Sequence, residues 1–99
     1  MPSWNFITNH GAVLTIVSQR PQITGREMSQ LLGITERAVL RIVADLESSG
    51  YLSRTRQGRT NSYKVNQDLP LPIPMLKDVA MGDLLDALAS RSVENVTND

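Results

Sequence analysis

Cysteine is absent from this 99-residue sequence, and aromatic residues and histidine are scarce. Without cysteine the chain can form no disulfide, no cysteine-ligated zinc site and no thiol-based redox centre, and the composition suits a cytoplasmic protein. His10 is the only histidine. One imidazole on a mostly apolar segment does not make a metal site, so we expect neither a metal nor a cofactor. We interpret His10 as a buried or interfacial structural residue.

Long apolar runs are also missing. Residues 1–19 carry no Asp, Glu, Lys or Arg, but Asn, Thr and His interrupt their apolar residues. This stretch is too short and too interrupted to span a membrane, and it lacks the basic lead-in of a signal peptide. We expect an internal helix there, in a chain short enough for one packed unit.

Patterns typical of catalysis are lacking as well. The sequence contains no phosphate-binding glycine loop and no metal-ligand spacing. Asp78, Asp83 and Asp86 lie on one segment near the end of the chain, where exposure to solvent explains them. We therefore expect no enzymatic activity.

Charge is distributed unevenly although the net charge is zero. Residues 20–64 hold eight Lys and Arg against four Asp and Glu, a net charge of +4, and residues 65–99 hold two against six, a net charge of −4. Clustered positive charge is typical of phosphate binding. A net charge of +4 over 45 residues also fits an ordinary solvated surface, so the charge alone leaves both interpretations open.

Apolar spacing and capping residues predict three helices before residue 50. The first should run from about residue 3 or 4 to residue 18, with Ser3 as its cap, and Pro21 prevents its continuation. Ile23 can form a very short strand after it. Two further helices are expected, one with a capping box of Thr24 and Glu27 and an end at Gly33, and one over residues 36–49 with Thr35 as its cap.

A change of pattern follows Gly50. The alternating runs "YLSRTR" and "NSYKV", joined by "QGRT", predict a two-stranded hairpin with glycine at its turn. The run "NQDLPLPIP" predicts an extended, semi-rigid spacer. A last helix is expected from about residue 75 or 76 to residue 89. We therefore divide the chain into a helix-turn-helix unit with its hairpin (1–66), a Pro-rich spacer (67–75) and a terminal helix with a polar tail (76–99).

The second and third predicted helices are joined by the short turn "LLGIT", as in a helix-turn-helix, in which the second helix enters the major groove of DNA. Val39, Ile42, Val43 and Leu46 cluster on one side of a helical wheel. Arg37 and Arg41 project from the other side, where arginine can bond guanine. An ordinary solvated face, with these arginines paired to Glu36 and Asp45, is the alternative. The expected base contacts are Glu36, Arg37, Leu40, Arg41 and Ala44.

The predicted hairpin is rich in cations. We expect Arg54 and Arg56 to share one face of the first strand, opposite Leu52, and Arg59 to lie at the tip beside Gly58. Such a tip arginine can reach a phosphate or a minor groove. The alternative is that these charges protect an edge strand from pairing with other chains. The expected contacts to the DNA backbone or minor groove are Arg26, Thr35, Arg54, Arg56, Arg59 and Lys64.

Residues 22–66, and above all "LGITERAVLRIVADLESSGYL", resemble the winged helix-turn-helix domain of bacterial and archaeal transcriptional regulators of the MarR and ArsR kind. The resemblance implies a recognition helix over 36–48, a wing over 53–63, homodimers and palindromic operators. The metal-sensing cysteines of the ArsR kind have no counterpart here, and the long flanking helices of MarR-type regulators are missing. The resemblance therefore does not support the sensing of a ligand.

Apolar residues at both ends of the chain exceed what a three-helix core can cover, which predicts a partner chain. We expect a two-fold homodimer built from the first and last helices; the alternative is that the last helix folds back onto the first helix of its own chain. The expected interface residues are Trp4, Ile7, Leu14, Leu76, Val79, Leu84 and Leu88.

The predicted fold is α+β and mainly helical: a winged helix-turn-helix with a three-helix core, a two-stranded wing and an additional C-terminal helix. The predicted function is a homodimeric transcriptional regulator that binds double-stranded DNA sequence-specifically. The alternative is a winged helix that serves protein–protein contact or belongs to a larger complex.

Overall fold

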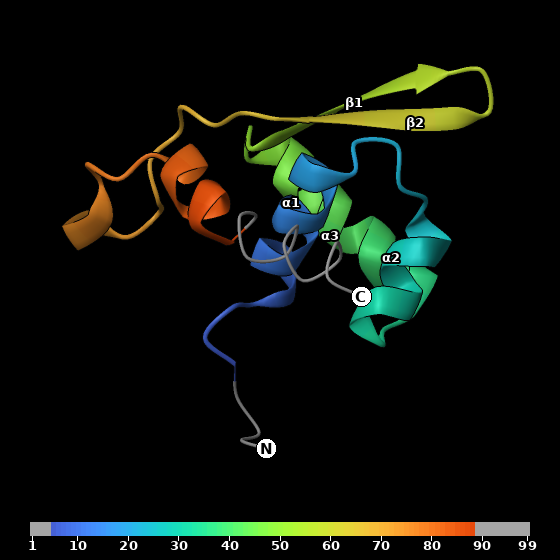
Figure 1. Cartoon of the computed structure of the whole chain (residues 1–99), viewed down its shortest axis with the longest axis horizontal. Coiled ribbons are helices and arrows are strands. Elements are labelled where there is room, and N and C mark those ends of the chain that lie inside the picture. Colours follow the sequence, from blue (N-terminus) through green and yellow to red (C-terminus); the bar gives the residue numbers. More distant parts are fainter. Residues whose placement is uncertain (1–4, 89–99) are drawn as a thin grey trace, which may run out of the picture.

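Three α-helices, a two-stranded hairpin and a short C-terminal helical segment make up the structure, a computed structural model that describes residues 5–88 (Figure 1). This is the predicted α+β, mainly helical winged helix-turn-helix with an additional C-terminal helix. The elements are α1 (Asn9–Gln19), α2 (Gly25–Leu32), α3 (Glu36–Ser48), β1 (Leu52–Gln57), β2 (Thr60–Val65), the 3-10 turn η1 (Pro74–Leu76) and a helix over residues 81–88.

The first helix begins later than predicted. Thr8 is extended, and its hydroxyl accepts a hydrogen bond of 3.2 Å from the backbone N–H of Gly11, so Thr8 is the N-cap. Residues 5–8 are therefore not helical. A threonine cap inside the apolar stretch outweighs the apolar spacing that suggested an earlier start. The expected cap Ser3 lies outside the described residues.

The second and third helices form as predicted, because their start signals are local. The hydroxyl of Thr24 accepts from the backbone N–H of Glu27 at 3.0 Å, and the Glu27 carboxylate accepts from the backbone N–H of Thr24 at 3.1 Å, which completes the capping box. Gly33 ends α2 at φ 68°, a left-handed conformation that glycine adopts without strain. Thr35 caps α3 through the backbone N–H of Ala38 at 3.0 Å.

One apolar core joins all parts of the described chain. Four apolar residues lie on one side of α3, because their spacing matches the helical period. This side faces the interior of the domain. Burial of that side fixes α3 between α1, α2 and the hairpin, and so fixes which of its side chains face outward. The buried core residues are Val13, Leu14, Val17, Ile23, Met28, Val39, Ile42, Val43, Leu46, Leu52, Tyr63, Met81 and Leu85.

The very short strand expected at Ile23 does not form. Ile23 is buried, but within the described residues one backbone hydrogen bond links this loop to the hairpin. The N–H of Tyr63 donates to the carbonyl of Pro21 at 2.8 Å. Proline has no N–H to continue a ladder, so one hydrogen bond pins the loop without making a strand.

The hairpin has the predicted turn, and Arg54 and Arg56 share one face as predicted, but Leu52 does not lie on the other face. Its register pairs Leu52 with Val65, and Gly58 takes φ 63° at the first of two turn positions. Residues two apart lie on the same face of a strand, so Arg54 shares the face of Leu52 and does not lie opposite to it. The expectation that they oppose each other was wrong.

The C-terminal segment folds back onto the domain and is not an extended spacer. Pro70 bridges Ala80, and the N–H of Met81 donates to the carbonyl of Leu69 at 2.7 Å. The Tyr51 hydroxyl donates to the carbonyl of Pro70 at 2.8 Å, which ties the segment to the end of α3. The last helix begins at residue 81, later than predicted, and packs in its own chain, the alternative that the sequence left open.

Candidate nucleic-acid interface

The outward side of α3 presents the residues predicted to contact bases. Arg37, Leu40, Arg41 and Ala44 are all exposed, Leu40 to 53% of its surface. Arg37 and Arg41 are four apart and therefore adjacent on one side of the helix. No hydrogen bond or ion pair of either guanidinium is found within the described part of the chain. Both forks are available for an external ligand.

The start of α3 carries Thr35 and Glu36. The Thr35 hydroxyl is engaged as the cap of the helix, at 3.0 Å from the N–H of Ala38. Glu36 is exposed in the first turn, where its negative charge interacts favourably with the helix dipole. Both residues therefore have a structural role, and Glu36 places a negative charge at the edge of the predicted base-contact surface.

The other two carboxylates of α3 bind other elements of the chain. A carboxylate oxygen of Asp45 lies 2.9 Å from Nε2 of His10 on α1, within hydrogen-bonding distance. Glu47 forms an ion pair with Arg54 of β1 at 3.2 Å. The alternative in which Asp45 pairs with the arginines of α3 is therefore not what the structure shows. His10 is about half exposed and links two helices, so it is interfacial and not buried.

The cations of the hairpin do not lie on one surface. Arg54 is held by Glu47, and the Nε of Arg56 donates to the carbonyl of Gly58 at 3.2 Å. Lys64 pairs across the strands with Ser53, and this pair occupies the face opposite to Arg54 and Arg56. A single DNA duplex against the α3 side of the hairpin would meet the arginines before it met Lys64.

The tip of the hairpin lies beside the start of α2. Arg59 lines a hollow of about 140 Å³ together with Thr24 and Gly25, and Arg26 follows in the first turn of α2. Neither arginine has a side-chain partner within residues 5–88. The fold thus brings together two predicted backbone contacts that are 33 positions apart, which the sequence alone did not indicate.

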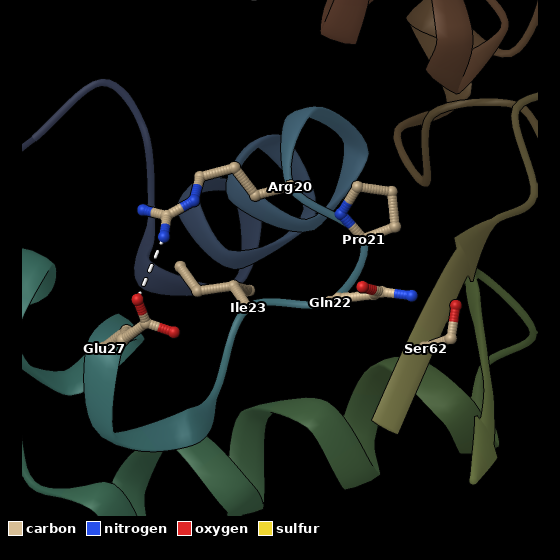
Figure 2. Close-up of a pocket in the computed structure, with 6 residues that line it drawn as sticks. All are labelled: Arg20, Pro21, Gln22, Ile23, Glu27 and Ser62. Atoms are coloured by element: carbon tan, nitrogen blue, oxygen red, sulfur yellow. Dashed lines mark hydrogen bonds and ion pairs between the residues drawn. The ribbon is translucent and has the colours of Figure 1, made fainter. Parts of the chain in front are cut away.

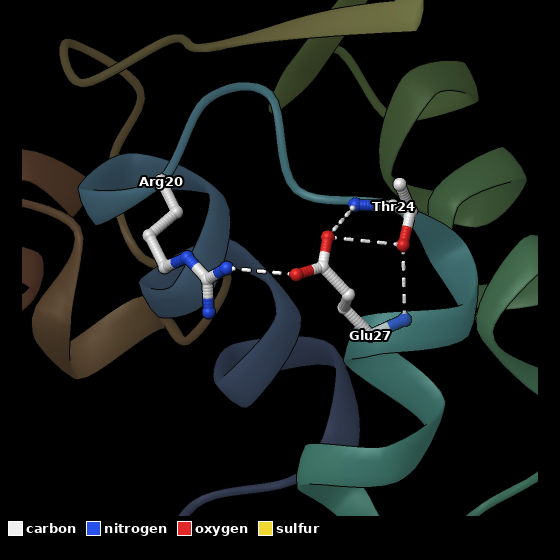
Figure 3. A network of polar contacts seen from close by, with 3 residues as sticks. All are labelled: Arg20, Thr24 and Glu27. Carbon is white, nitrogen blue, oxygen red and sulfur yellow. Dashed lines mark hydrogen bonds and ion pairs between the residues drawn. The ribbon is translucent and has the colours of Figure 1, made fainter.

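Arg20 is a further exposed cation, and the fold pairs it with a carboxylate of α2. Its guanidinium donates to the Glu27 carboxylate at 2.9 Å, beside the capping box (Figure 3). The hydrogen bonds from the backbone N–H and hydroxyl of Thr24 lower the pKa of Glu27 most, and the charge of Arg20 lowers the pKa further. This ion pair, between residues seven apart across a loop, left no signal in the sequence.

An open hollow of about 380 Å³ beside this network is shown in Figure 2. Its wall holds Arg20 and Glu27, which neutralise each other, and Ser62 of β2. Its one guanidinium already has a carboxylate partner. We assign no ligand to it.

The residues predicted for a dimer interface are divided between the core and the surface. Leu14 is 3% exposed and belongs to the core of its own chain, and Trp4 lies outside the described residues. Ile7 is exposed, and Leu76, Val79, Leu84 and Leu88 are half-buried. Three further exposed apolar side chains were not among the predicted interface residues: Phe6, Ile73 and Met75. Ile73 and Met75 flank Pro74, in the stretch that was predicted to be only a spacer.

Two kinds of feature are absent from residues 5–88. None of the helices there has the length and apolar character needed to cross a membrane. Within the same residues, no three side chains among His, Cys, Asp and Glu are arranged to hold a metal ion.

Comparison with protein families gives one match. A family model described as an HTH domain matches residues 12–60, from the first turn of α1 to the first residue of β2. The matched segment contains the Gly33 turn and the whole of α3, and it supports a helix-turn-helix DNA-binding domain. Fold and match together identify residues 12–60 as a helix-turn-helix domain, which β2 completes to the winged form.

Proposed function

We propose that this protein is a transcriptional regulator that binds double-stranded DNA sequence-specifically, with α3 in the major groove and the wing on the backbone or minor groove. The observation that carries the proposal is a pair of exposed arginines on the outward side of α3, whose other side is buried. Neither arginine has a side-chain partner within residues 5–88. The two N–H groups of one arginine match the acceptor pair of one guanine, and Leu40, which lies beside these arginines, suits a thymine methyl group.

Phosphate contacts are proposed for the cations around this helix. Arg26 and Arg59 have no side-chain partner within residues 5–88 and lie near the start of α2, on the first turn of that helix and at the tip of the wing. Arg54 and Arg56 have weak intramolecular partners on exposed surfaces, which a phosphate can replace. Such contacts position the protein on the duplex, whereas the α3 side chains select the sequence.

A homodimer is part of the proposal. Exposed apolar side chains occur near both ends of the described chain, with Ile7 exposed to 38% and Met75 to 86%. Two such surfaces on so small a domain favour burial against a second copy. A two-fold dimer would place its half-sites about 34–36 Å apart on DNA. We propose, on the resemblance of residues 22–66, a short relative of the MarR and ArsR kinds that works with DNA in the cytoplasm.

The test of the α3 assignment is a double variant, Arg37→Ala with Arg41→Ala, measured on a duplex that the protein has selected from a random library. We expect the preference over a scrambled duplex to fall by at least about tenfold, since one good bidentate contact discriminates by about 1–3 kcal/mol. Lys77→Ala is the control, because it removes an exposed cation from the C-terminal segment. An unchanged preference in the double variant would refute the assignment.

A protein-binding winged helix is the second candidate. It is favoured by Leu31 on α2 and Leu40 on α3, which are exposed to 60% and 53%, and by a net charge of zero for the whole chain. Exposed leucines on both helices of the motif suit an apolar partner as well as a DNA groove. If no duplex is enriched from the library, this candidate replaces the first.

A further inference from the structure

A cavity of about 230 Å³ lies behind α3, between α1, the corner where α3 meets β1, and the C-terminal segment. Its wall is almost wholly apolar and draws on parts of the chain that are far apart in sequence. Leucine is the commonest residue in it: Leu14, Leu46, Leu71, Leu84, Leu85 and Leu88.

The few polar side chains in the wall are already satisfied. Thr8 accepts from the N–H of Gly11 at 3.2 Å, His10 is paired with Asp45 at 2.9 Å, and the Tyr51 hydroxyl donates to Pro70 at 2.8 Å. Each of these side chains therefore has a partner in its own chain, and the rest of the wall offers a water molecule few of the two to four polar partners that it needs. Among the described residues, no buried side-chain nitrogen or oxygen lacks a hydrogen-bond partner.

We propose that this cavity binds a small, uncharged, apolar molecule of about the size of one or two aromatic rings. An apolar cavity of about 150 Å³ stays dry and takes up benzene, because a dry void lacks partner atoms that such a ligand supplies. The larger volume found here leaves room for substituents. A charged group is strongly disfavoured, since an almost wholly apolar wall offers it little in exchange for the water that it would lose.

The position of the cavity gives the ligand contact with the DNA-binding part of the chain. Leu46 belongs to the same helix as Arg41, and Tyr51 holds the C-terminal segment against the end of that helix. A bound molecule would therefore contact α1, α3 and the C-terminal segment at once. Binding to the folded state alone would also stabilise the fold. The inference does not depend on DNA binding.

The experiment is an NMR titration of the protein's leucine methyl groups with toluene and, separately, with benzylamine, which is a cation of similar shape at neutral pH. Leu84→Trp is the filling variant, because Leu84 is half-buried at the wall and a larger ring there occupies the cavity. Leu31→Trp is the matched control, with the same substitution on an exposed site of α2.

We expect toluene to shift the methyl signals of Leu14, Leu84 and Leu85 in a saturable way, and to leave Leu31 and Leu40 unmoved. Benzylamine should bind at least roughly tenfold more weakly, since its charge would lose hydration. Leu31→Trp should bind toluene like the parent chain, and Leu84→Trp should not.

Three results would overturn the proposal. The first is the absence of saturable shifts at the cavity methyl groups up to the solubility limit of toluene. The second is unchanged toluene binding by Leu84→Trp in a protein that is shown to be folded, which places the site elsewhere. The third is a dimer in solution whose interface covers these leucines and excludes toluene, which makes a second copy the occupant.

Discussion

Two arginines, Arg37 and Arg59, are expected to have different roles in DNA binding. Arg37 lies on the outward side of α3, and Arg59 lies at the wing tip beside the start of α2. We expect Arg37→Ala to relax the choice of sequence at one base pair. Arg59→Ala should weaken binding to all duplexes alike and reduce the slope of log affinity against log salt by about one unit.

Binding titrations on a selected and a scrambled duplex at four salt concentrations separate these outcomes. Each variant is compared with Lys77→Ala, which changes the charge by the same amount away from both sites. If Arg59→Ala lowered only the binding of the selected duplex, the wing tip would read bases and the division of roles would be wrong.

Glu27 connects the capping box to the pH dependence of stability. The hydrogen bonds from Thr24 and the charge of Arg20 lower the pKa of Glu27 in the folded chain. A lowered pKa means that its contribution to stability is complete above the ordinary pKa of glutamate, about 4.3. That contribution is lost as the pH falls through the lowered value.

We therefore expect urea unfolding of the parent chain to show a loss of stability below about pH 4.5 that is smaller in Glu27→Gln. The variant should be less stable than the parent at pH 7 and closer to it in acid. Glu36→Gln is the comparison, because Glu36 is exposed in the first turn of α3 and makes no capping box. Equal pH profiles for the parent and Glu27→Gln would contradict this role of the carboxylate.

At the scale of elements, local chemistry decided what could be predicted. The caps Thr24 and Thr35 and the turn glycines Gly33 and Gly58 act within a few residues of themselves, so α2, α3 and the hairpin were predicted within one or two positions. The start of α1 was missed because a local cap, Thr8, competed with the apolar spacing. Leu52 and Arg54 share a face because residues two apart in a strand lie on the same side. This could have been predicted from the sequence.

The C-terminal segment contains one close approach between backbones, at Gly82. The N–H of Gly82 donates to the carbonyl of Gln67 at 2.9 Å, and a Cβ added at residue 82 would lie 2.8 Å from the Cβ of Gln67. We expect Gly82→Ala to lower the free energy of unfolding by about 1–3 kcal/mol, as overpacking typically does. Urea denaturation measures the loss.

Gly25→Ala is the matched control for this prediction. Its added Cβ would meet no atom within 4 Å, and Gly25 is the first residue of α2. We expect this change to be neutral or to stabilise the chain by up to about 1 kcal/mol, since alanine has less freedom to lose on folding. Equal losses in the two variants would show that the contact with Gln67 has no special weight.

At the scale of the whole molecule, contacts between distant residues set the limit of prediction. Met81 and Leu85 join the core of the winged domain, and the Tyr51 hydroxyl holds Pro70, but neither contact has a signature in the proline alternation of residues 67–75. The ion pairs of Asp45 and Glu47 with other elements are equally non-local. The outward side of α3 could be predicted, because it depends only on helical period and on which side is apolar.

The uneven charge along the sequence is also uneven in space. The four acidic residues after position 65 that the structure describes belong to the C-terminal segment at one end of the described chain, and the wing tip projects at the other end (Figure 1). These residues are Asp68, Asp78, Asp83 and Asp86. An orientation with the wing toward DNA therefore keeps these four carboxylates away from the phosphates. This asymmetry is how a chain of zero net charge can present a basic surface to DNA.

Selection from a random duplex library at moderate salt, with the mass of the protein in solution measured alongside, tests the central claim most directly. We expect enrichment of an inverted repeat with half-sites about 34–36 Å apart, together with a dimer mass. Absence of enrichment, with binding that is weak and equal for all duplexes, would contradict sequence-specific regulation and leave the protein-binding winged helix as the function.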